Sequence, residues 1–498
     1  MLFNSFAFAI FLPLVLVLYW SIFNRKNVTL RNSFLLVASY IFYAWWDWRF
    51  LSLIIISSLT DFWLGAKMDA INQRQNDVSE EQLTALRRQK RIWLLISLIT
   101  NLGFLGFFKY FGFFTESFAA MMSLVGITVS PVTLNIILPV GISFYTFQTL
   151  SYTIDIYRGK VEATKSWVQF FAFVAFFPQL MAGPIERATT FLPQFKNLAQ
   201  KPKYSDFRNA MLLIAWGFFK KIMIADRLAV FVDGAFKDSA AADGLPMLLG
   251  VVFFAFQLYL DFSAYSDIAI GVARMFGFNL RRNFMRPYLS ASFGNFWKRW
   301  HISLSSWFQD YLYIPMGGNR KGVSRTQLNV LIVFAVSGLW HGASWNFVIW
   351  GLLNAMFLIL LDPILNLTRK GETSKDNVVV WFFKAVLIFA CWTLSLAFFR
   401  AQGFDAALDC FRHIGFANAE NIVNFGLNAN ELILTFILLG ILLLKGMAWE
   451  KSETIVPAFF YKLPFVFRWI FYIVFVLVII YFGQYGNGNE HSFIYFQF

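Results

Sequence analysis

Charged residues are scarce in this sequence of 498 residues. Asp, Glu, Lys and Arg together make up 14% of it, whereas a soluble globular chain is about a quarter charged. Hydrophobic residues make up 58%, and one residue in five is aromatic. A soluble fold could not shield so much apolar surface from water, so the lipid bilayer must be part of the solvent.

Cysteine and the common catalytic motifs are also missing or rare. The two cysteines, Cys391 and Cys410, have no partner at metal-ligand spacing, and they exclude a disulfide framework. The chain lacks a GxxxxGKS or GxxxxGKT phosphate loop, an HExxH helix and paired CxxC, which are the usual signals of ATP-driven transport and zinc hydrolysis. It also lacks a Gly-Asp-Ser nucleophile motif. We expect no metal and no bound cofactor, and no self-contained esterase.

Acidic residues are outnumbered by Lys and Arg, and the formal net charge is +14. The excess of Lys and Arg lies in short loops between apolar runs, as the positive-inside rule requires, and no basic face is interleaved with a soluble fold. We therefore expect contacts with membrane lipids and no nucleic acid. No Lys or Arg precedes the first apolar run, Phe6 to Phe23, and Arg25 follows it. This order predicts an uncleaved first span with its N-terminus outside.

Long apolar runs recur along the chain. A spanning helix needs about 20 apolar residues, and we predict roughly 10 to 12 true spans with further interfacial or re-entrant segments. The fold class is therefore an all-α polytopic integral membrane protein, with a single membrane domain over 1–498 because no internal repeat is visible. The candidate spans are 5–23, 33–46, 49–65, 92–110, 134–156, 167–182, 207–225, 247–272, 328–361 (in one or two pieces), 379–399, 431–447 and 465–483.

Two segments combine helix breakers with polar residues. The segment 139–159 starts with the helix breakers Pro139 and Gly141, and polar side chains follow them. The segment 176–187 is interrupted by Pro178, Gly183 and Pro184. The freed backbone groups need partners at membrane depth, so we expect both segments to face a cavity inside the protein rather than lipid.

The stretch 261–350 is the expected active site. It begins with Asp261 and Asp267, two carboxylates inside an apolar helix. They are six residues apart and do not share a helix face, so we do not expect a carboxylate dyad that shares a proton. Structural hydrogen-bonding anchors are favoured over catalytic acids.

Two of the chain's four histidines lie in this stretch; His413 and His491 lie in late polar segments and are expected bystanders. The segment from Phe296 to Tyr313, which holds His301, is amphipathic at helical spacing and predicts an interfacial helix in the membrane plane. Residues 274–325 carry nine bases and one acid. Their basic surface suits lipid headgroups or a phosphate-rich acyl donor such as coenzyme A, and residue types do not separate the two.

His341 lies in an apolar segment, where an ionisable group is a functional candidate by default. If 337–345 is helical, His341 shares one face with Trp340 and three other side chains, those of Ser337, Ser344 and Trp345. Gly338 and Gly342 flank this face and would let a substrate or another helix approach closely. Imidazole is well suited to take a proton from a hydroxyl near neutral pH, so we favour a functional role for His341, while His301 remains evenly balanced.

Six motifs together resemble the membrane-bound O-acyltransferases, within them the bacterial alginate O-acetyltransferase branch, over nearly the whole chain. They are PVGISFYTFQTLSYTIDIYRG, FFPQLMAGPIER, YLDFSAYSDIAIGVARMFGF, FWKRWHISLSSWFQDYLYIPMGGNR, SGLWHGASWNFVIWG and FIYFQF. The resemblance implies about 11 membrane helices around a central tunnel, with short in-plane helices. It also implies that His341 is the family's invariant histidine and that His301 is the second active-site position.

The resemblance further implies a function. We expect an O-acetyltransferase of the bacterial inner membrane that takes an acetyl group from cytoplasmic acetyl-CoA or another acetyl thioester. The acetyl group would pass through the tunnel to an exopolysaccharide or cell-wall polymer, with a periplasmic acetyltransferase- or esterase-like partner protein. A basic surface would hold the donor's phosphates; its residues are Arg281, Arg282, Lys298, Arg299, Arg320 and Lys321.

Two alternatives stay open. Transfer of D-alanine or another acyl group to a cell-envelope polymer uses the same architecture. A transporter or channel with a polar tunnel is a different class, and it would show several intramembrane charges in corresponding halves with repeat symmetry. The sequence shows neither halves nor symmetry, which favours the enzyme.

Overall fold

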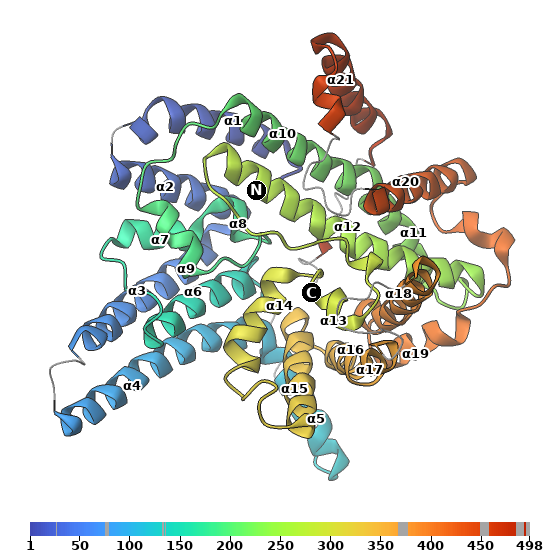
Figure 1. The fold of residues 1–498 in the computed structure, drawn as a ribbon. Helices are drawn as coiled ribbons and strands as arrows, with labels where there is room; N and C mark the ends of the chain where they lie inside the picture. Colours follow the sequence, from blue (N-terminus) through green and yellow to red (C-terminus); the bar gives the residue numbers. More distant parts are fainter. Residues whose placement is uncertain are drawn as a thin grey trace. The chain divides into compact units, whose positions relative to one another are not determined.

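The computed structural model describes residues 1–498 except 26, 75–78, 132–133, 135, 367–376, 449–457, 485–492 and 495–498. The described residues form helices, and the one β contact among them is an isolated bridge between Gly244 and Ile414. This confirms the predicted all-α class (Figure 1).

Nine helical stretches in the described part of the chain are long and apolar enough to cross a membrane. One of them, Val28–Arg74, contains two helices that are each at least 20 residues long. The protein is therefore a multi-pass membrane protein. The nine are Phe6–Arg25, Val28–Arg74, Glu80–Leu124, Leu245–Met275, Val323–His341, Trp345–Leu365, Val378–Arg400, Ala429–Met447 and Phe465–Phe482.

The chain forms two compact units that alternate along the sequence. The first unit comprises Met1–Ala210 and Ala269–Arg281, and the second comprises Met211–Ile268 and Arg282–Phe498. The long helix α12, Leu245–Met275, and the shorter α10, Tyr204–Phe218, contribute residues to both units. The single domain over 1–498 stays a prediction.

The first unit is built from helices of very different lengths. They are α1 (Phe6–Ser21), α2 (Val28–Asp47), α3 (Leu51–Arg74), α4 (Glu80–Leu105), α5 (Phe111–Leu124), α6 (Ile142–Tyr157), α7 (Trp167–Ala175), α8 (Phe177–Leu180) and α9 (Ala188–Phe191). In this unit α6 packs against α3 and α4, and α2 packs against α7. Helix α4 starts with the polar residues that follow Ser79, which is its N-cap and forms a capping box with Gln82.

The two segments with helix breakers are largely buried inside the first unit, and the cavity that they are expected to face stays a prediction. Gly141 has a left-handed backbone (φ 78°) and begins α6, and a Cβ on it would come within 2.5 Å of the Leu180 carbonyl oxygen. Gln148 on α6 and Gln179 on α8 both donate to the Phe173 carbonyl, at 2.8 and 2.9 Å. Amide side chains thus satisfy a carbonyl that the end of α7 leaves without a helical partner.

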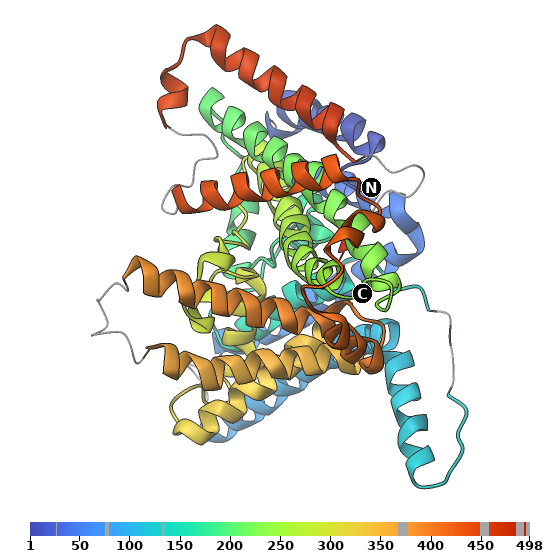
Figure 2. The ribbon, with the colours of Figure 1, turned by 90° about the vertical axis from the view of Figure 1, so that its right-hand side faces the viewer.

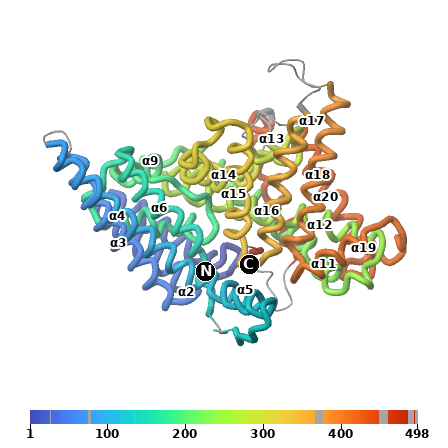
Figure 3. Tube along the Cα trace, turned by 90° about the horizontal axis from the view of Figure 1, so that it is seen from below, coloured from blue at the N-terminus to red at the C-terminus, as the bar shows by residue number. Residues whose placement is uncertain are grey.

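The second unit contains the remaining helices. They are α11 (Asp226–Lys237), α13 (Phe293–Trp297), α14 (Ile302–Phe308), α15 (Val323–His341), α16 (Trp345–Met356), α17 (Asp362–Asn366), α18 (Val378–Arg400), α19 (Phe404–His413), α20 (Ala429–Ala448) and α21 (Phe465–Phe482). Helices α15 and α16 run side by side (Figures 1 and 3). The orange helices of Figure 2 show α18 lying along α16, with which it packs. Buried aromatic side chains fill the core of this unit, among them Trp300, Trp350 and Trp392.

Candidate functional site

His301 and His341 meet inside the second unit, although they are 40 residues apart in the sequence. Their ring centroids are 6.4 Å apart, with an interplanar angle of 63°. Both side chains are buried, with 1% and 4% of their surface exposed. The structure thus brings together the two histidines of the expected active site.

His301 occupies a strained backbone position. Its φ of 42° and ψ of 55° are left-handed, a conformation that a residue other than glycine adopts at a cost of about 1–3 kcal/mol, and such strain clusters at functional sites. The strained residue separates α13 from α14. The predicted single amphipathic helix over 296–313 is therefore wrong: the chain forms α13, a turn, α14 and a π-helical turn at Gln309–Tyr313. Ser303, a polar residue of this segment, is buried.

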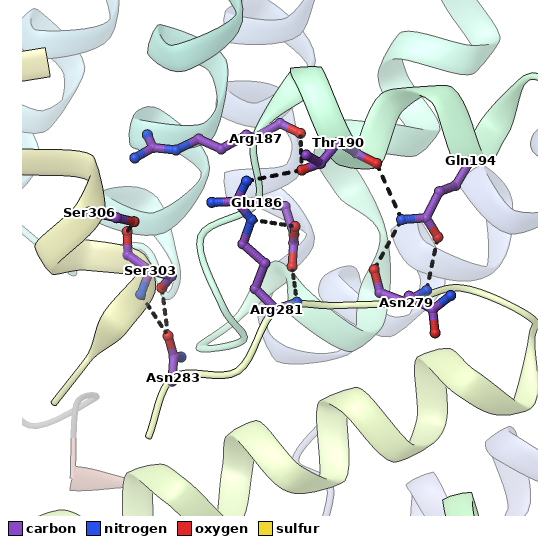
Figure 4. A network of polar contacts seen from close by, with 9 residues as sticks. All are labelled: Glu186, Arg187, Thr190, Gln194, Asn279, Arg281, Asn283, Ser303 and Ser306. Atoms are coloured by element: carbon purple, nitrogen blue, oxygen red, sulfur yellow. Dashed lines mark hydrogen bonds and ion pairs between the residues drawn. The ribbon is translucent and has the colours of Figure 1, made fainter. Parts of the chain in front are cut away.

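Asn283 holds the strained turn in place. Its backbone carbonyl accepts a hydrogen bond from Ile302 N at 2.9 Å, and its Oδ1 accepts from Ser303 Oγ at 2.6 Å. Its Nδ2 donates to Ser266 Oγ on α12 at 3.1 Å. Figure 4 shows the contact between Asn283 and Ser303. The sequence does not indicate a role for Asn283, because an Asn in a basic loop carries no signal until its partners are known.

His341 is the last residue of α15, and the helix ends there. Gly342 is extended (φ −157°), and Ser344 is the N-cap of α16, accepting from Asn346 N at 3.2 Å. The predicted continuous helical face over 337–345 is therefore wrong, because Ser344 and Trp345 belong to the next helix and Trp345 is exposed. The alternative that 328–361 forms two pieces is confirmed.

The glycines beside His341 serve the contact between helices. A Cβ on Gly338 would overlap the Phe347 carbonyl oxygen, and a Cβ on Gly342 would overlap the Phe347 ring. On α16, a Cβ on Gly351 would overlap the Phe334 carbonyl oxygen. Of the two predicted uses of Gly338 and Gly342, the structure shows the close approach of another helix.

Aromatic rings enclose both imidazoles. The His341 ring lies 5.0 Å from Trp340, 5.2 Å from Trp350 and 5.5 Å from Phe399, measured between centroids. The His301 ring lies 4.6 Å from Phe262. Burial lowers the pKa of His301 to about 3, so its imidazole is neutral at physiological pH.

The carboxylates of α12 each pair with a lysine. Asp267 Oδ2 lies 2.9 Å from Lys220 Nζ, and Asp261 Oδ1 lies 2.8 Å from Lys221 Nζ. Both lysines lie in the π-helical segment Phe219–Ala225. Since the two carboxylates have separate cationic partners, they do not form a dyad, and the geometry favours the predicted anchoring role.

The six basic residues expected to hold donor phosphates are distributed over both units. Arg281 belongs to the first unit, where its backbone N donates to Glu186 Oε1 at 2.6 Å and its Nη2 donates to Thr190 Oγ1 at 3.3 Å (Figure 4). The other five belong to the second unit. Arg282 and Arg299 are half-buried there, and Arg299 Nε donates to Asn295 Oδ1 at 3.2 Å. Lys298, Arg320 and Lys321 are exposed.

The remaining histidines and cysteines lie elsewhere. His413, at the end of α19, contacts the Asp409 carbonyl oxygen through Nδ1 at 2.9 Å, and His491 lies outside the described residues. Cys391 is half-buried and Cys410 is buried, and both are free thiols. Among the described residues, no group of three or more His, Cys, Asp and Glu side chains could hold a metal ion.

Comparisons with known proteins identify relatives of this chain. A family model described as the membrane-bound O-acyltransferase family matches residues 40–401. The probable alginate O-acetylase AlgI of Pseudomonas putida is 40% identical over 404 residues, 81% of this chain and 78% of the relative. A peptidoglycan O-acetyltransferase of Helicobacter pylori is 33% identical over 87% of this chain and 83% of its own length. A teichoic acid D-alanyltransferase of Streptococcus thermophilus is 28% identical over 53% and 67%.

Proposed function

Because the chain belongs to the membrane-bound O-acyltransferase family and is therefore an acyltransferase, we propose that it O-acetylates an exported polysaccharide or cell-wall polymer. The observation that carries the proposal is the pair of buried imidazoles with ring centroids 6.4 Å apart. The names of the relatives, alginate O-acetylase and peptidoglycan O-acetyltransferase, support acetyl as the acyl group and a polysaccharide as the acceptor.

His341 is the general base in this proposal. Its imidazole takes the proton of the acceptor hydroxyl, the hydroxyl oxygen attacks the acetyl carbon, the C–S bond of the thioester breaks, and the proton passes to the departing thiolate. In the alternative route His341 attacks the acetyl carbon first, the C–S bond breaks and the thiolate leaves; the hydroxyl then cleaves the acyl-imidazole, and its proton goes to the thiolate. His301, neutral because of its burial, orients the thioester or assists the proton transfer.

The donor is acetyl-CoA or another acetyl thioester on the cytoplasmic side. Its negative groups suit the basic residues of the stretch: Arg281, Arg282, Lys298, Arg299, Arg320 and Lys321. The exposure of Arg320 and Lys321 supports this role, since their guanidinium and ammonium groups are accessible to a soluble donor.

The acceptor lies on the other side of the bacterial inner membrane. In this proposal the N-terminus is outside, the acetyl group crosses through a central tunnel, and a periplasmic acetyltransferase- or esterase-like partner completes delivery. The absence of a Gly-Asp-Ser motif in the chain supports such a division of labour. D-alanyl transfer is the second candidate, favoured by the 28% identical teichoic acid D-alanyltransferase.

The decisive experiment follows labelled acetyl groups from the cell interior to an outer polymer. His341→Ala should lower the transfer by at least about 100-fold, the usual contribution of a general base, with unchanged amounts of folded protein in the membrane. His301→Ala should lower it too. His413→Ala is the matched control and should transfer acetyl at the normal rate. Normal transfer by His341→Ala would refute the assignment, and labelled D-alanine on the polymer would select the second candidate.

A further inference from the structure

A buried lysine joins two carboxylates next to the histidine site. Lys221 Nζ lies 2.8 Å from Asp226 Oδ1 and 2.8 Å from Asp261 Oδ1. The three side chains are buried, with 9%, 6% and 3% of their residues' surface exposed. Buried charges are costly unless they are paired, so this arrangement constrains the position of all three groups.

The second oxygen of Asp261 binds the C-terminal segment. Asp261 Oδ2 accepts a hydrogen bond from the backbone N–H of Ile494 at 2.7 Å. Lys221 and Ile494 therefore contact opposite oxygens of one carboxylate. Without the Lys221 ammonium group, the ion pair no longer fixes the orientation in which the Asp261 carboxylate accepts the hydrogen bond from Ile494.

The segment so held lies against the histidine site. The Phe493 ring is 5.6 Å from the Phe262 ring and 4.8 Å from the Tyr265 ring. Phe262 follows Asp261 in α12, and its ring is 4.6 Å from His301. A displacement of Asp261 or of Phe493 is thus transmitted to His301 through one aromatic ring.

The π-helical segment Phe219–Ala225 and the adjoining α11 also contact residues 482 and 484. The Ile222 carbonyl accepts from Gln484 N at 3.1 Å, and Arg227 Nη2 donates to the Phe482 carbonyl at 2.6 Å. A π-helical turn is wider than an α-helical one and leaves carbonyls free of their usual i+4 partners; such turns are frequent at functional sites. The segment that carries Lys221 therefore contacts Gln484 directly and Ile494 through Asp261, while Arg227 of the adjoining α11 contacts Phe482.

We propose that Lys221 is a positioning residue: by bridging Asp226 and Asp261 it fixes Phe262 and the C-terminal residues Phe493 and Ile494 against His301. The inference rests on the proposed function of the histidine site for its effect on acetyl transfer. Its geometric part, the docking of Ile494, is measurable without any transfer.

The test uses the full chain in membranes, with Ile494→Cys as a reporter in a Cys391→Ala, Cys410→Ala background. Ile494 is 2% exposed, so a maleimide should label the reporter thiol slowly while the bridge is present. In Lys221→Met we expect labelling to accelerate at least about tenfold, because protection reflects local opening, and kcat for acetyl transfer to fall more than KM changes. Lys221→Arg retains a cation, so it should restore much of the protection of the reporter thiol and much of the kcat for acetyl transfer.

Lys220→Met is the matched control. Lys220 lies in the same π-helical segment and is also buried, but its partners are Asp267 and Ser263. Its loss should leave the reporter thiol protected. If Lys221→Met fails to fold, Lys221→Met with Asp226→Asn removes the bridge with fewer uncompensated charges and should give the same labelling.

Two results separate this inference from the proposed function. A reporter thiol that stays protected in the Lys221 variants overturns the inference, whatever the transfer rate. In His341→Ala, the reporter thiol should stay protected while transfer is lost. Normal transfer in that variant would refute the proposed function but leave the labelling result intact.

Discussion

Asp61 and Asp267 are both carboxylates within long apolar helices, but their side chains have partners of different kinds in the two units. In the first unit, Asp61 is completely buried and receives hydrogen bonds from Ser97 Oγ at 2.6 Å and Asn101 Nδ2 at 2.8 Å. Within the described part of the chain, no Lys or Arg forms an ion pair with it. In the second unit, Asp267 pairs with the Lys220 ammonium group at 2.9 Å.

The difference indicates what each acid does. A network of hydroxyl and amide groups binds a carboxyl group in either protonation state and joins α3 to α4, so Asp61 suits a purely structural contact. A buried lysine ammonium group requires an anionic partner. The ion pairs of Lys220 and Lys221 therefore hold the π-helical segment against α12 as long as both partners stay charged. That rigidity is found in the unit that contains both site histidines.

The largest expected effect is the loss of the charge at Asp267. Asp267→Asn leaves the buried Lys220 ammonium group without an anionic partner, and the free energy of unfolding should fall by about 3 kcal/mol, the low end for a broken buried pair because Asp267 is partly exposed. Thermal unfolding in detergent, followed by the loss of monodisperse protein, measures the change. If the free energy of unfolding decreases by less than about 0.5 kcal/mol, the ion pair of Asp267 is not needed for stability and the proposed difference between the two units is wrong.

Glu186 of the first unit gives an intermediate case outside the membrane spans. Burial raises its pKa to about 7, against an ordinary value near 4.5, although the nearby Arg281 opposes the shift. The unfolded chain therefore releases this proton first, and stability should fall as the pH rises from about 4.5 through about 7, by at most roughly 3 kcal/mol. Glu186→Gln should flatten this decline when melting temperatures are compared at pH 5 and pH 8, and an unchanged slope would contradict it.

The smallest effect is expected for the same substitution in the first unit. Asp61→Asn keeps the oxygen that accepts from Ser97 but turns an NH2 group toward the Asn101 amide, so stability should fall by about 1–2 kcal/mol, the cost of one lost buried hydrogen bond and less than that of a broken buried ion pair. Parallel melts of Asp61→Asn and Asp267→Asn test the comparison directly. Equal losses in the two variants would show that both acids depend on charge pairing.

Much of the fold could be predicted from the sequence, because spans are set by local hydrophobicity. The same rule that identified Asp261 and Asp267 applies to Asp61, which lies in the apolar run 49–65 but was not singled out. Lys220 and Lys221 carried the corresponding signal as two cations at the end of the run 207–225. The break after His341 was also readable, since Gly342 and Ser344 are typical of a helix end and a new N-cap.

The arrangement of the site could not be predicted. The 6.4 Å between His301 and His341 depends on the strained turn at His301, on Asn283 and on the packing of α15 against α16. These are contacts between residues distant in the sequence, and no local pattern encodes their distances. The resemblance named both histidines, but their separation and surroundings required the structure.

The glycine contacts between α15 and α16 have a consequence for turnover. Because Gly338 and Gly351 bring the two backbones into direct contact, α15 has no compressible side-chain layer against its partner. His341 therefore cannot swing toward an incoming group by shifting its helix. In the proposed reaction, the thioester and the hydroxyl must therefore travel to a stationary imidazole.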